Sequence, residues 1–231
     1  MTSPAYTRLS RDQMAWRAAQ DLPDGCFVNL GIGIPTLAAS YVPAGREVIF
    51  HSENGVIGLG PKPKPGEEDP NLTDAGKNLS TLVTGGCYVH HADAFLMIRG
   101  GHLDLSLLGA FEVSETGDLA NWTTEDPAFP PGVGGAMDLA VGAREIRVLM
   151  AHTHKSGSPR ILKRCSLPLT APGVVKRIYT DLAVIDVTPK GLVVLEMIPG
   201  MTLELLQTMT EPKLHLAESW GALAPPQAKA A

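Results

Sequence analysis

Residues 26–60, CFVNLGIGIPTLAASYVPAGREVIFHSENGVIGLG, decide the fold class. Residues 26–30 form a short apolar run that is typical of a buried strand, and a glycine turn with Gly31 and Gly33 follows directly. Pro35 then begins a helix, at a position where its missing N–H removes no hydrogen bond. Residues 47–50 form a second apolar strand. The order strand, glycine turn, helix, strand predicts a parallel sheet covered by helices.

The flanking segments extend the same pattern. Ser10 and Gln13 have the spacing of a capping box and predict a helix through Leu22. Further elements are expected downstream, as strands at 103–108 and 146–150, a hairpin of strands 182–187 and 192–197, and a short terminal helix at 202–208. The sequence therefore predicts an α/β fold with an open, mostly parallel, Rossmann-like sheet flanked by helices. We expect one domain over residues 1–221 and a disordered tail over 222–231.

Charge and composition exclude several classes of partner. The chain has 231 residues and a net charge of -5, with its Lys and Arg scattered, so we expect no nucleic-acid binding. No apolar run approaches the ~20 residues that span a bilayer, and the polar N-terminus has no targeting core. Cys26, Cys87 and Cys165 are widely spaced and predict buried thiols in a reduced, cytoplasmic setting.

Glu53 is the first candidate for chemistry. It follows the strand at 47–50 and precedes Gly55, Gly58 and Gly60, which indicate a loop where a ligand can approach the backbone. A carboxylate in this place is a solvated turn residue, a cap or a reactive group. No serine stands in a Gly-x-Ser-x-Gly frame and no cysteine is flanked like a nucleophile. For acyl chemistry, a carboxylate is thus the available nucleophile.

Three other patterns leave alternatives open. The turn at Gly31 and Gly33 suggests a dinucleotide loop, but Thr36 stands where that fingerprint has Gly or Ala. The histidines at 90–91, read as neighbours on a strand, and those at 152 and 154 invite a metal interpretation, but structural histidines are expected and no metal site is predicted. Residues 132–135, GVGG, form either a turn before a helix or a row of N–H donors for an oxyanion.

Longer motifs resemble one enzyme family. They are VNLGIGIPT at 28–36, SENG at 52–55, GEEDPNLTDAGK at 66–77, TGGCYVHHADAF at 84–95, RGGHLDLSLLGAFEVSETGDLANW at 99–122, GVGGAMDL at 132–139, RCSLPLT at 164–170 and RIYTDLAVIDVTPKGL at 177–192. In these stretches the chain is similar to the B (β) subunit of class I 3-oxoacid CoA-transferases. The resemblance covers about residues 8–212.

This resemblance implies a function and a set of site residues. Glu53 would attack an acyl-CoA thioester and carry first the acyl group and then coenzyme A. Asn29, Gly134 and Gly135 would bind the oxyanion. Further contacts with coenzyme A or the acyl group are expected from Gly31, Gly33, Asn54, Lys77 and Arg99. Coenzyme A would be a substrate and no permanent cofactor is expected; the partner would be the A (α) subunit of the same enzyme.

The acceptor acid stays open between two branches of the family. The stretches GAFEVS, GDLANW and TTEDPAFPPGVGG look like enzymes that transfer coenzyme A from succinyl-CoA to 3-oxoadipate, whereas SPRILKRCSLPLT looks like those that use acetoacetate. We expect 3-oxoadipate, whose far carboxylate would need an additional cation, supplied by Arg99 or by the partner subunit. A nucleotide-binding oxidoreductase and a non-catalytic scaffold subunit are the alternatives from other classes.

Overall fold

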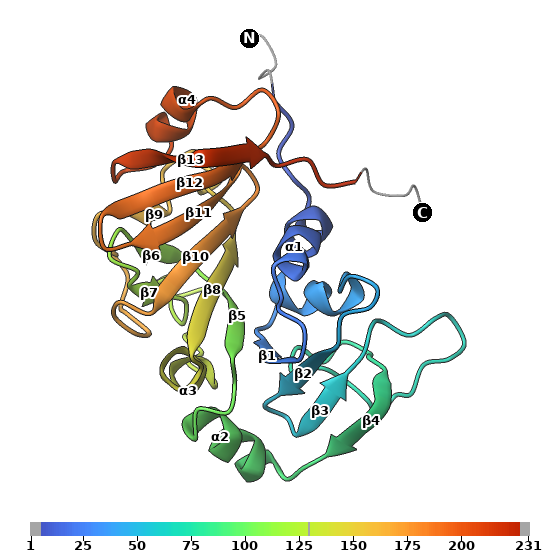
Figure 1. Ribbon diagram of the computed structural model, residues 1–231. Coiled ribbons are helices and arrows are strands. Elements are labelled where there is room, and N and C mark those ends of the chain that lie inside the picture. The colour runs from blue at the N-terminus through green and yellow to red at the C-terminus, as the bar shows by residue number, and fades with distance from the viewer. Residues whose placement is uncertain (1–5, 129, 227–231) are drawn as a thin grey trace.

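The computed structural model describes residues 6–128 and 130–226 and is built around one large sheet (Figure 1). The sheet has ten strands in the order β13-β12-β11-β10-β8-β5-β1-β2-β3-β4. Their bounds are β1 Cys26–Leu30, β2 Val48–Ser52, β3 Val56–Leu59, β4 Leu82–Tyr88, β5 Leu105–Gly109, β8 Glu145–Met150, β10 Val175–Thr180, β11 Ala183–Thr188, β12 Gly191–Met197 and β13 Leu214–Ala222.

The centre of the sheet is parallel. Strands β10, β8, β5, β1 and β2 pair in parallel with one another. Toward the two edges, β11 pairs antiparallel with β10, β3 with β2, and β4 with β3. At the outer edge, β13 is parallel to β12. The run at 26–30 is almost entirely buried, as expected for a strand with covered faces. The predicted open, mostly parallel α/β sheet is confirmed.

The strand order reverses at β1. The chain runs from β1 outward to β2, β3 and β4, and β5 then returns to the other side of β1 before β8 and β10 continue in that direction. In open α/β sheets, ligands bind at the carboxyl ends of the strands beside such a reversal. The topology therefore predicts that ligand-binding residues directly follow β1, β2 and β5.

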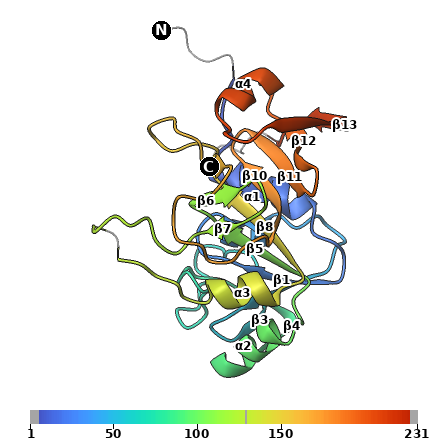
Figure 2. The same cartoon turned by 90° about the vertical axis from the view of Figure 1, so that its left-hand side faces the viewer.

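Two pairs of helices cover the centre. Helix α1 (Arg11–Gln20) packs on the short helix η1 (Pro35–Ser40), and α2 (His91–Arg99) packs on α3 (Ala136–Gly142). The views show α1 and α3 on opposite sides of β8 (Figures 1 and 2). Helix α4 (Leu203–Thr208) lies against β13, and a small second sheet has the order β7 (Leu119–Ala120), β6 (Glu112–Ser114), β9 (Ile161–Leu162). None of the helices in the described ranges is long and apolar enough to cross a membrane.

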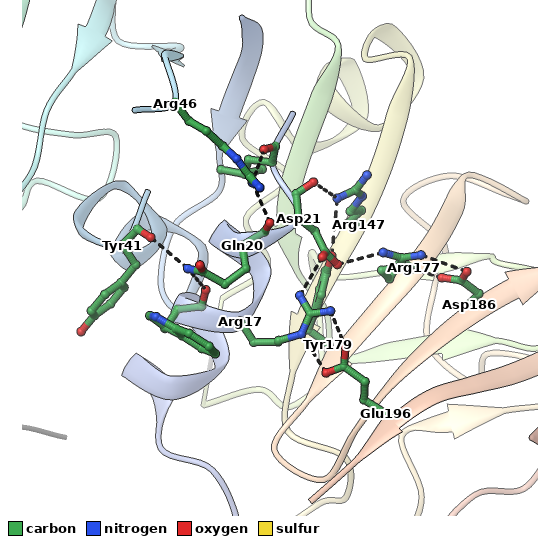
Figure 3. Close-up of polar contacts among 12 residues, drawn as sticks. Arg17, Gln20, Asp21, Tyr41, Arg46, Arg147, Arg177, Tyr179, Asp186 and Glu196 are labelled. Carbon is green, nitrogen blue, oxygen red and sulfur yellow. Dashed lines mark hydrogen bonds and ion pairs between the residues drawn. The ribbon is translucent and has the colours of Figure 1, made fainter. Parts of the chain in front are cut away.

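A charged network joins α1 to the sheet (Figure 3). Arg17 pairs with Asp21 at 2.7 Å and with Glu196 of β12 at 2.6 Å. Arg177 of β10 pairs with Asp21 at 2.8 Å, and the Tyr179 hydroxyl donates to Asp21 at 2.7 Å. These side chains are largely buried, so the contacts are worth more than exposed ion pairs. The network fixes the helix that borders the cavity described below.

The N-terminal predictions are largely confirmed, with two corrections. Ser10 caps α1 through a complete capping box with Gln13. The helix predicted at Pro35 is a 3-10 helix of six residues, and it has no side-chain cap. The predicted loop after Glu53 is wrong over residues 56–59, because these form β3, antiparallel to β2. Gly58 lies within this strand, where a Cβ would meet the neighbouring strand, so glycine here reflects close backbone packing.

Three further expectations differ from the structure. The helix expected at 202–208 is α4, but it is not terminal because β13 follows it. A disordered tail was expected from residue 222, but Ala222 ends β13 and Leu223 is buried; residues 227–231 lie outside the described ranges. Cys87 is exposed on β4 rather than buried. Its strand forms the sheet edge and has an open face.

Candidate active site

A cavity of about 770 Å³ opens at the carboxyl ends of β1, β5 and β8. It lies beside the reversal of strand order, where the topology favours a ligand. Its lining residues come from the start of α1, the turn after β1, the ends of β5 and β8, and the segment before α3. Among them are Arg11, Gly31, Glu53, Gly134, Gly135 and Arg160.

Among the described residues, Glu53 is one of two carboxylates that line this cavity, the other being Asp181, which directly follows β10. Glu53 comes directly after β2, is half-buried, and its Oε2 accepts a hydrogen bond from Asn29 Nδ2 at 3.1 Å. The Glu53 carbonyl oxygen lies 2.7 Å from His91 Nδ1 and therefore accepts its N–H. Gly55 closes the turn through an N–H bond to Ser52 O at 3.0 Å, with a φ of 103° that favours glycine. Backbone and side chain of Glu53 are thus both held.

Asn29 is the buried residue whose side-chain amide contacts this carboxylate. It lies on β1, fully buried, in register with His51 of β2 and Ser106 of β5. Besides Glu53, its Nδ2 lies 3.2 Å from both the Nδ1 and the carbonyl oxygen of His51. The pairing of β1 with β2 sets this register and brings Asn29 and Glu53 together. A buried amide aimed at a carboxylate is a preset hydrogen-bond donor.

The glycine segment before α3 approaches the same carboxylate. Gly134 has a φ of 50°, and a Cβ built on Gly135 would lie 3.9 Å from Glu53 Cγ and 3.0 Å from the Phe95 ring. Glycine at 135 therefore lets the backbone come close to the Phe95 ring, and Glu53 lies beside it at an ordinary contact distance. Within the described part of the chain, the N–H groups of Gly134 and Gly135 donate no backbone hydrogen bond. The segment is a turn before α3, as one interpretation of GVGG expected, and its role as a row of oxyanion donors stays a prediction.

The remaining predicted site residues divide between the cavity and other places. Gly31 lines the cavity, but its N–H donates to Leu107 O at 2.8 Å and is not free for a ligand. Gly33 lines a second cavity, of about 640 Å³, between η1 and residues 59–80. Asn54 is exposed and its amide donates to Thr73 O at 2.9 Å, which ties down the long loop.

Lys77 and Arg99 line neither cavity in the described residues. Lys77 is exposed in a turn with a φ of 64°, an uncommon conformation for a residue with a side chain. Arg99, in the last turn of α2, pairs with Asp138 at 2.6 Å. Its pKa is raised by the hydrogen bond to Asp138 and by the charge of that carboxylate. Arg99 is therefore committed to a contact between α2 and α3.

The turn after β1 does not favour a dinucleotide. Gly31 N–H is used within the sheet, and the following helix is a short 3-10 helix that starts with Pro35. A phosphate site of this type needs free amides at the start of an α-helix.

The histidine motifs have structural partners. His90 does not lie on a strand but caps α2, and its Nδ1 accepts from Ala92 N at 3.1 Å. His152 is buried between Thr180 and Thr210. In residues 6–128 and 130–226, no group of three His, Cys, Asp or Glu side chains is placed to hold a metal ion.

Sequence reasoning missed three residues at or beside the cavity. Arg11 and Arg160 line it and supply positive charge that we had expected from Arg99. Arg160 comes from a distant part of the chain, and no local pattern indicates its place. His51 precedes Glu53 by two residues, so the two-residue period of a strand would have indicated a shared face.

Comparisons with known proteins identify the family of this chain. The family model described as coenzyme A transferase matches residues 11–207. The B subunit of a 3-oxoadipate CoA-transferase from Acinetobacter baylyi is 53% identical over 89% of this chain and 95% of its own length. The B subunit of a probable succinyl-CoA:3-ketoacid coenzyme A transferase from Bacillus subtilis is 48% identical over 91% of this chain and 97% of its own.

A solved structure shows the same fold. An acyl-CoA transferase from Escherichia coli O157:H7 superposes with a TM-score of 0.70 at 18% identity, covering 96% of this chain and 44% of that one. At this identity the likeness shows the fold alone. The family match extends over most of the chain, and the two sequence relatives are aligned over nearly their whole length. This chain belongs to the coenzyme A transferase family.

Proposed function

We propose that this chain carries the catalytic glutamate of a CoA-transferase, and that it moves coenzyme A from succinyl-CoA to 3-oxoadipate. The observation that carries this proposal is the position of Glu53. Its half-buried carboxylate faces a cavity, is held by the Asn29 amide, and lies beside the backbone of Gly135. The name of the Acinetobacter baylyi relative supports 3-oxoadipate as the acceptor, and that of the Bacillus subtilis relative supports succinyl-CoA as the donor.

The first half-reaction begins with attack by a Glu53 oxygen on the thioester carbonyl carbon. The carbon–sulfur bond breaks, coenzyme A leaves as the thiolate, and an acyl-glutamyl anhydride forms. The thiolate then attacks the glutamyl carbonyl carbon of that anhydride. This step releases the donor acid as its carboxylate and leaves coenzyme A as a thioester on Glu53. The acceptor carboxylate runs the same steps in reverse and departs as the new CoA ester, which restores the Glu53 carboxylate.

Each attack creates a tetrahedral oxyanion that needs donors already in place. The candidate donors are Asn29 Nδ2, which contacts Glu53, and the N–H groups of Gly134 and Gly135, which donate no backbone hydrogen bond within the described residues. A lost donor of this kind typically raises the barrier by roughly 3–4 kcal/mol. Holding the weak nucleophile in place also lowers the barrier, because less entropy is lost on reaching the transition state.

The partner in this proposal is the A subunit of the same enzyme. The relatives that align with nearly the whole of this chain are themselves named as B subunits. The cavity beside Glu53 is open to solvent at the carboxyl ends of the central strands, so a second polypeptide would complete its walls and exclude water. Water must be excluded because the anhydride and the thioester are both hydrolysed readily.

Two arginines support an acceptor with a second carboxylate. Arg11, at the start of α1, and Arg160 both line the cavity. Arg160 already donates to the carbonyl oxygens of Ala110 and Phe111 at 2.6 and 2.8 Å. Arg11 is exposed, so we assign it the far carboxylate of 3-oxoadipate. Acetoacetate, the alternative acceptor, has no second carboxylate.

The role of Glu53 is tested by trapping the intermediate. The complex of this chain with its A subunit is mixed with succinyl-CoA, reduced with borohydride and digested. A glutamyl thioester is reduced to an alcohol, so peptide mass spectrometry should find residue 53 modified. E53Q should abolish both the modification and transfer activity. E47Q is the control, because Glu47 is exposed and directly precedes the first residue of β2, and this variant should preserve both. Full activity of E53Q would refute the mechanism and favour a scaffold role.

The acceptor is tested with Arg11. Initial rates are compared for 3-oxoadipate and acetoacetate in the wild type and in R11Q. Loss of a charge-assisted hydrogen bond should raise KM for 3-oxoadipate by roughly tenfold and leave KM for acetoacetate unchanged. R99Q is the matched control, because Arg99 is also an exposed arginine but lines no cavity in the described ranges. Faster transfer to acetoacetate than to 3-oxoadipate in the wild type would contradict the assignment.

A further inference from the structure

We propose that His51 is a positioning residue that holds the Asn29 amide with its nitrogen toward Glu53. This inference rests on the proposed role of Glu53 as the nucleophile. His51 lies at the centre of the sheet with 1% of its surface exposed, and no step of the transfer reaction requires it to touch substrate. Its contacts nevertheless form a chain that ends at the reacting carboxylate.

The chain starts at a backbone carbonyl. His51 Nε2 lies 3.1 Å from the carbonyl oxygen of Ala94 in α2. A carbonyl oxygen only accepts hydrogen bonds, so Nε2 must carry the proton. In a neutral imidazole the other nitrogen, Nδ1, is then an acceptor. Burial lowers the pKa of His51, which keeps the ring neutral near pH 7.

The second link is the amide of Asn29. With Nδ1 of His51 as an acceptor, the group that faces it at 3.2 Å must be the amide nitrogen of Asn29 and not its oxygen. The same nitrogen then donates to Glu53 Oε2 at 3.1 Å. The tautomer of His51, fixed by Ala94, thus decides which end of the amide reaches the carboxylate.

The oxygen end of the amide does not fix this orientation. Asn29 Oδ1 is buried and has no hydrogen-bond partner among the described residues. The orientation therefore depends on the acceptors near Nδ2, which are the His51 ring, the His51 carbonyl oxygen and Glu53 itself. Without the ring acceptor, only the His51 carbonyl oxygen and Glu53 itself hold the nitrogen in place, so the rotated state, with Oδ1 against the carboxylate, becomes more populated. Two oxygens would then repel each other where a donor is needed.

The consequence reaches every step of the reaction. Glu53 passes from carboxylate to anhydride to thioester, and each state presents an oxygen that needs a donor. A rotated Asn29 would lower the rate in both half-reactions and change substrate affinity little, because the donor acts mainly on charge that develops in the transition state.

Three variants of the complex with the A subunit separate this role from simple packing. H51L removes both ring nitrogens; H51Q keeps one donor and one acceptor on its terminal amide. S106A is the matched control, because Ser106 flanks Asn29 on the other side in the same register and its hydroxyl has no partner in the described ranges. The measurement is the rate at which residue 53 becomes trapped by borohydride after mixing with saturating succinyl-CoA.

We expect H51L to slow trapping by roughly 10- to 100-fold with KM nearly unchanged, because the ring supplies one of several contacts and full loss of a donor costs about 10²–10³. H51Q should restore the rate to within a few-fold, and S106A should match the wild type. A wild-type trapping rate in H51L, or a rate in H51Q as low as that in H51L, would overturn the inference. An absence of trapping in the wild type would instead refute the role of Glu53.

A second measurement uses the wild-type complex, so it does not require any variant to fold. The ¹⁵N chemical shifts of the two ring nitrogens of His51 report the tautomer in the wild-type complex. We expect protonation at Nε2 with Nδ1 unprotonated near pH 7. Protonation at Nδ1 would overturn the inference, because an N–H in that position cannot accept from Asn29.

Discussion

Acidification should destabilise this protein through His152, which follows β8 in the core. Its side chain is fully buried, with Nδ1 3.0 Å from Thr180 Oγ1 and Nε2 2.9 Å from Thr210 Oγ1. Burial lowers the pKa of His152 to about 4; the Asp181 charge acts in the opposite direction, and that of Arg8 adds to the lowering. The ring is therefore neutral in the folded protein at any pH well above 4.

The sign follows from the two pKa values. An unfolded chain has a histidine pKa near 6.5, so between about pH 6.5 and 4 the unfolded state binds a proton that the folded state does not. The stabilising contribution is fully present above pH 6.5, is lost as the pH falls, and stops changing below about pH 4. At about 1.4 kcal/mol for each pKa unit, the loss is about 2 kcal/mol between pH 7 and pH 5 and about 3 kcal/mol near pH 4.

The assay is guanidinium unfolding of the purified chain at several pH values, with H152Q as the comparison. Glutamine can bond to both threonines but does not titrate, so other ionisable groups contribute equally to the two proteins. The difference in unfolding free energy between wild type and H152Q should shift by about 2 kcal/mol in favour of H152Q from pH 7 to pH 5. A difference that stays constant with pH would refute the assigned pKa.

Three further predictions concern other parts of the chain. G55A should destabilise the protein by more than about 2 kcal/mol and impair transfer, because Gly55 has a positive φ and a Cβ there would overlap a backbone carbonyl oxygen. G45A should cost about 1 kcal/mol, because Gly45 also has a positive φ but lies in open space; thermal or guanidinium unfolding measures both. Cys87 should react quickly with a thiol reagent in the isolated native chain, whereas Cys165, whose pKa burial raises to about 12, should react only after unfolding. S10A should lose the cap of α1 and about 1 kcal/mol of stability in guanidinium unfolding.

The features that sequence predicted well depend on neighbouring residues. The capping box at Ser10 and Gln13 and the apolar run at 26–30 each carry their signal within a few positions, and the structure has a helix and a strand there. The position of Glu53 at a strand end was predicted for the same reason. Strand β3 was missed because its glycines indicate a loop, whereas the close approach of β4 that requires Gly58 comes from distant residues.

The contacts around Glu53 could not be derived from local patterns. Asn29 meets His51 because β1 and β2 pair in one particular register, and Gly135 reaches the carboxylate from a helix far along the chain. The resemblance supplied Asn29 and Gly135 as expectations, but it gave no reason to select His51. For Arg99 the charge suggested a substrate contact, whereas the structure shows a pair with Asp138 that comes from distant residues; the substrate contact stays a prediction.

The polar row Ser106, Asn29 and His51 runs across neighbouring strands where a parallel sheet normally buries aliphatic side chains. Two of its atoms, Ser106 Oγ and Asn29 Oδ1, have no hydrogen-bond partner within the described ranges, and an unsatisfied buried group costs about 1–3 kcal/mol. Stability alone would favour apolar residues at these positions. Local rules tend to be broken where a protein needs chemistry, which accounts for Asn29 and His51 because their hydrogen bonds lead to Glu53; Ser106 has no hydrogen bond to either and is not part of this chain. These unsatisfied polar groups destabilise the strands whose carboxyl ends border the cavity. The buried residues of the sheet and the candidate nucleophile therefore have to be explained together.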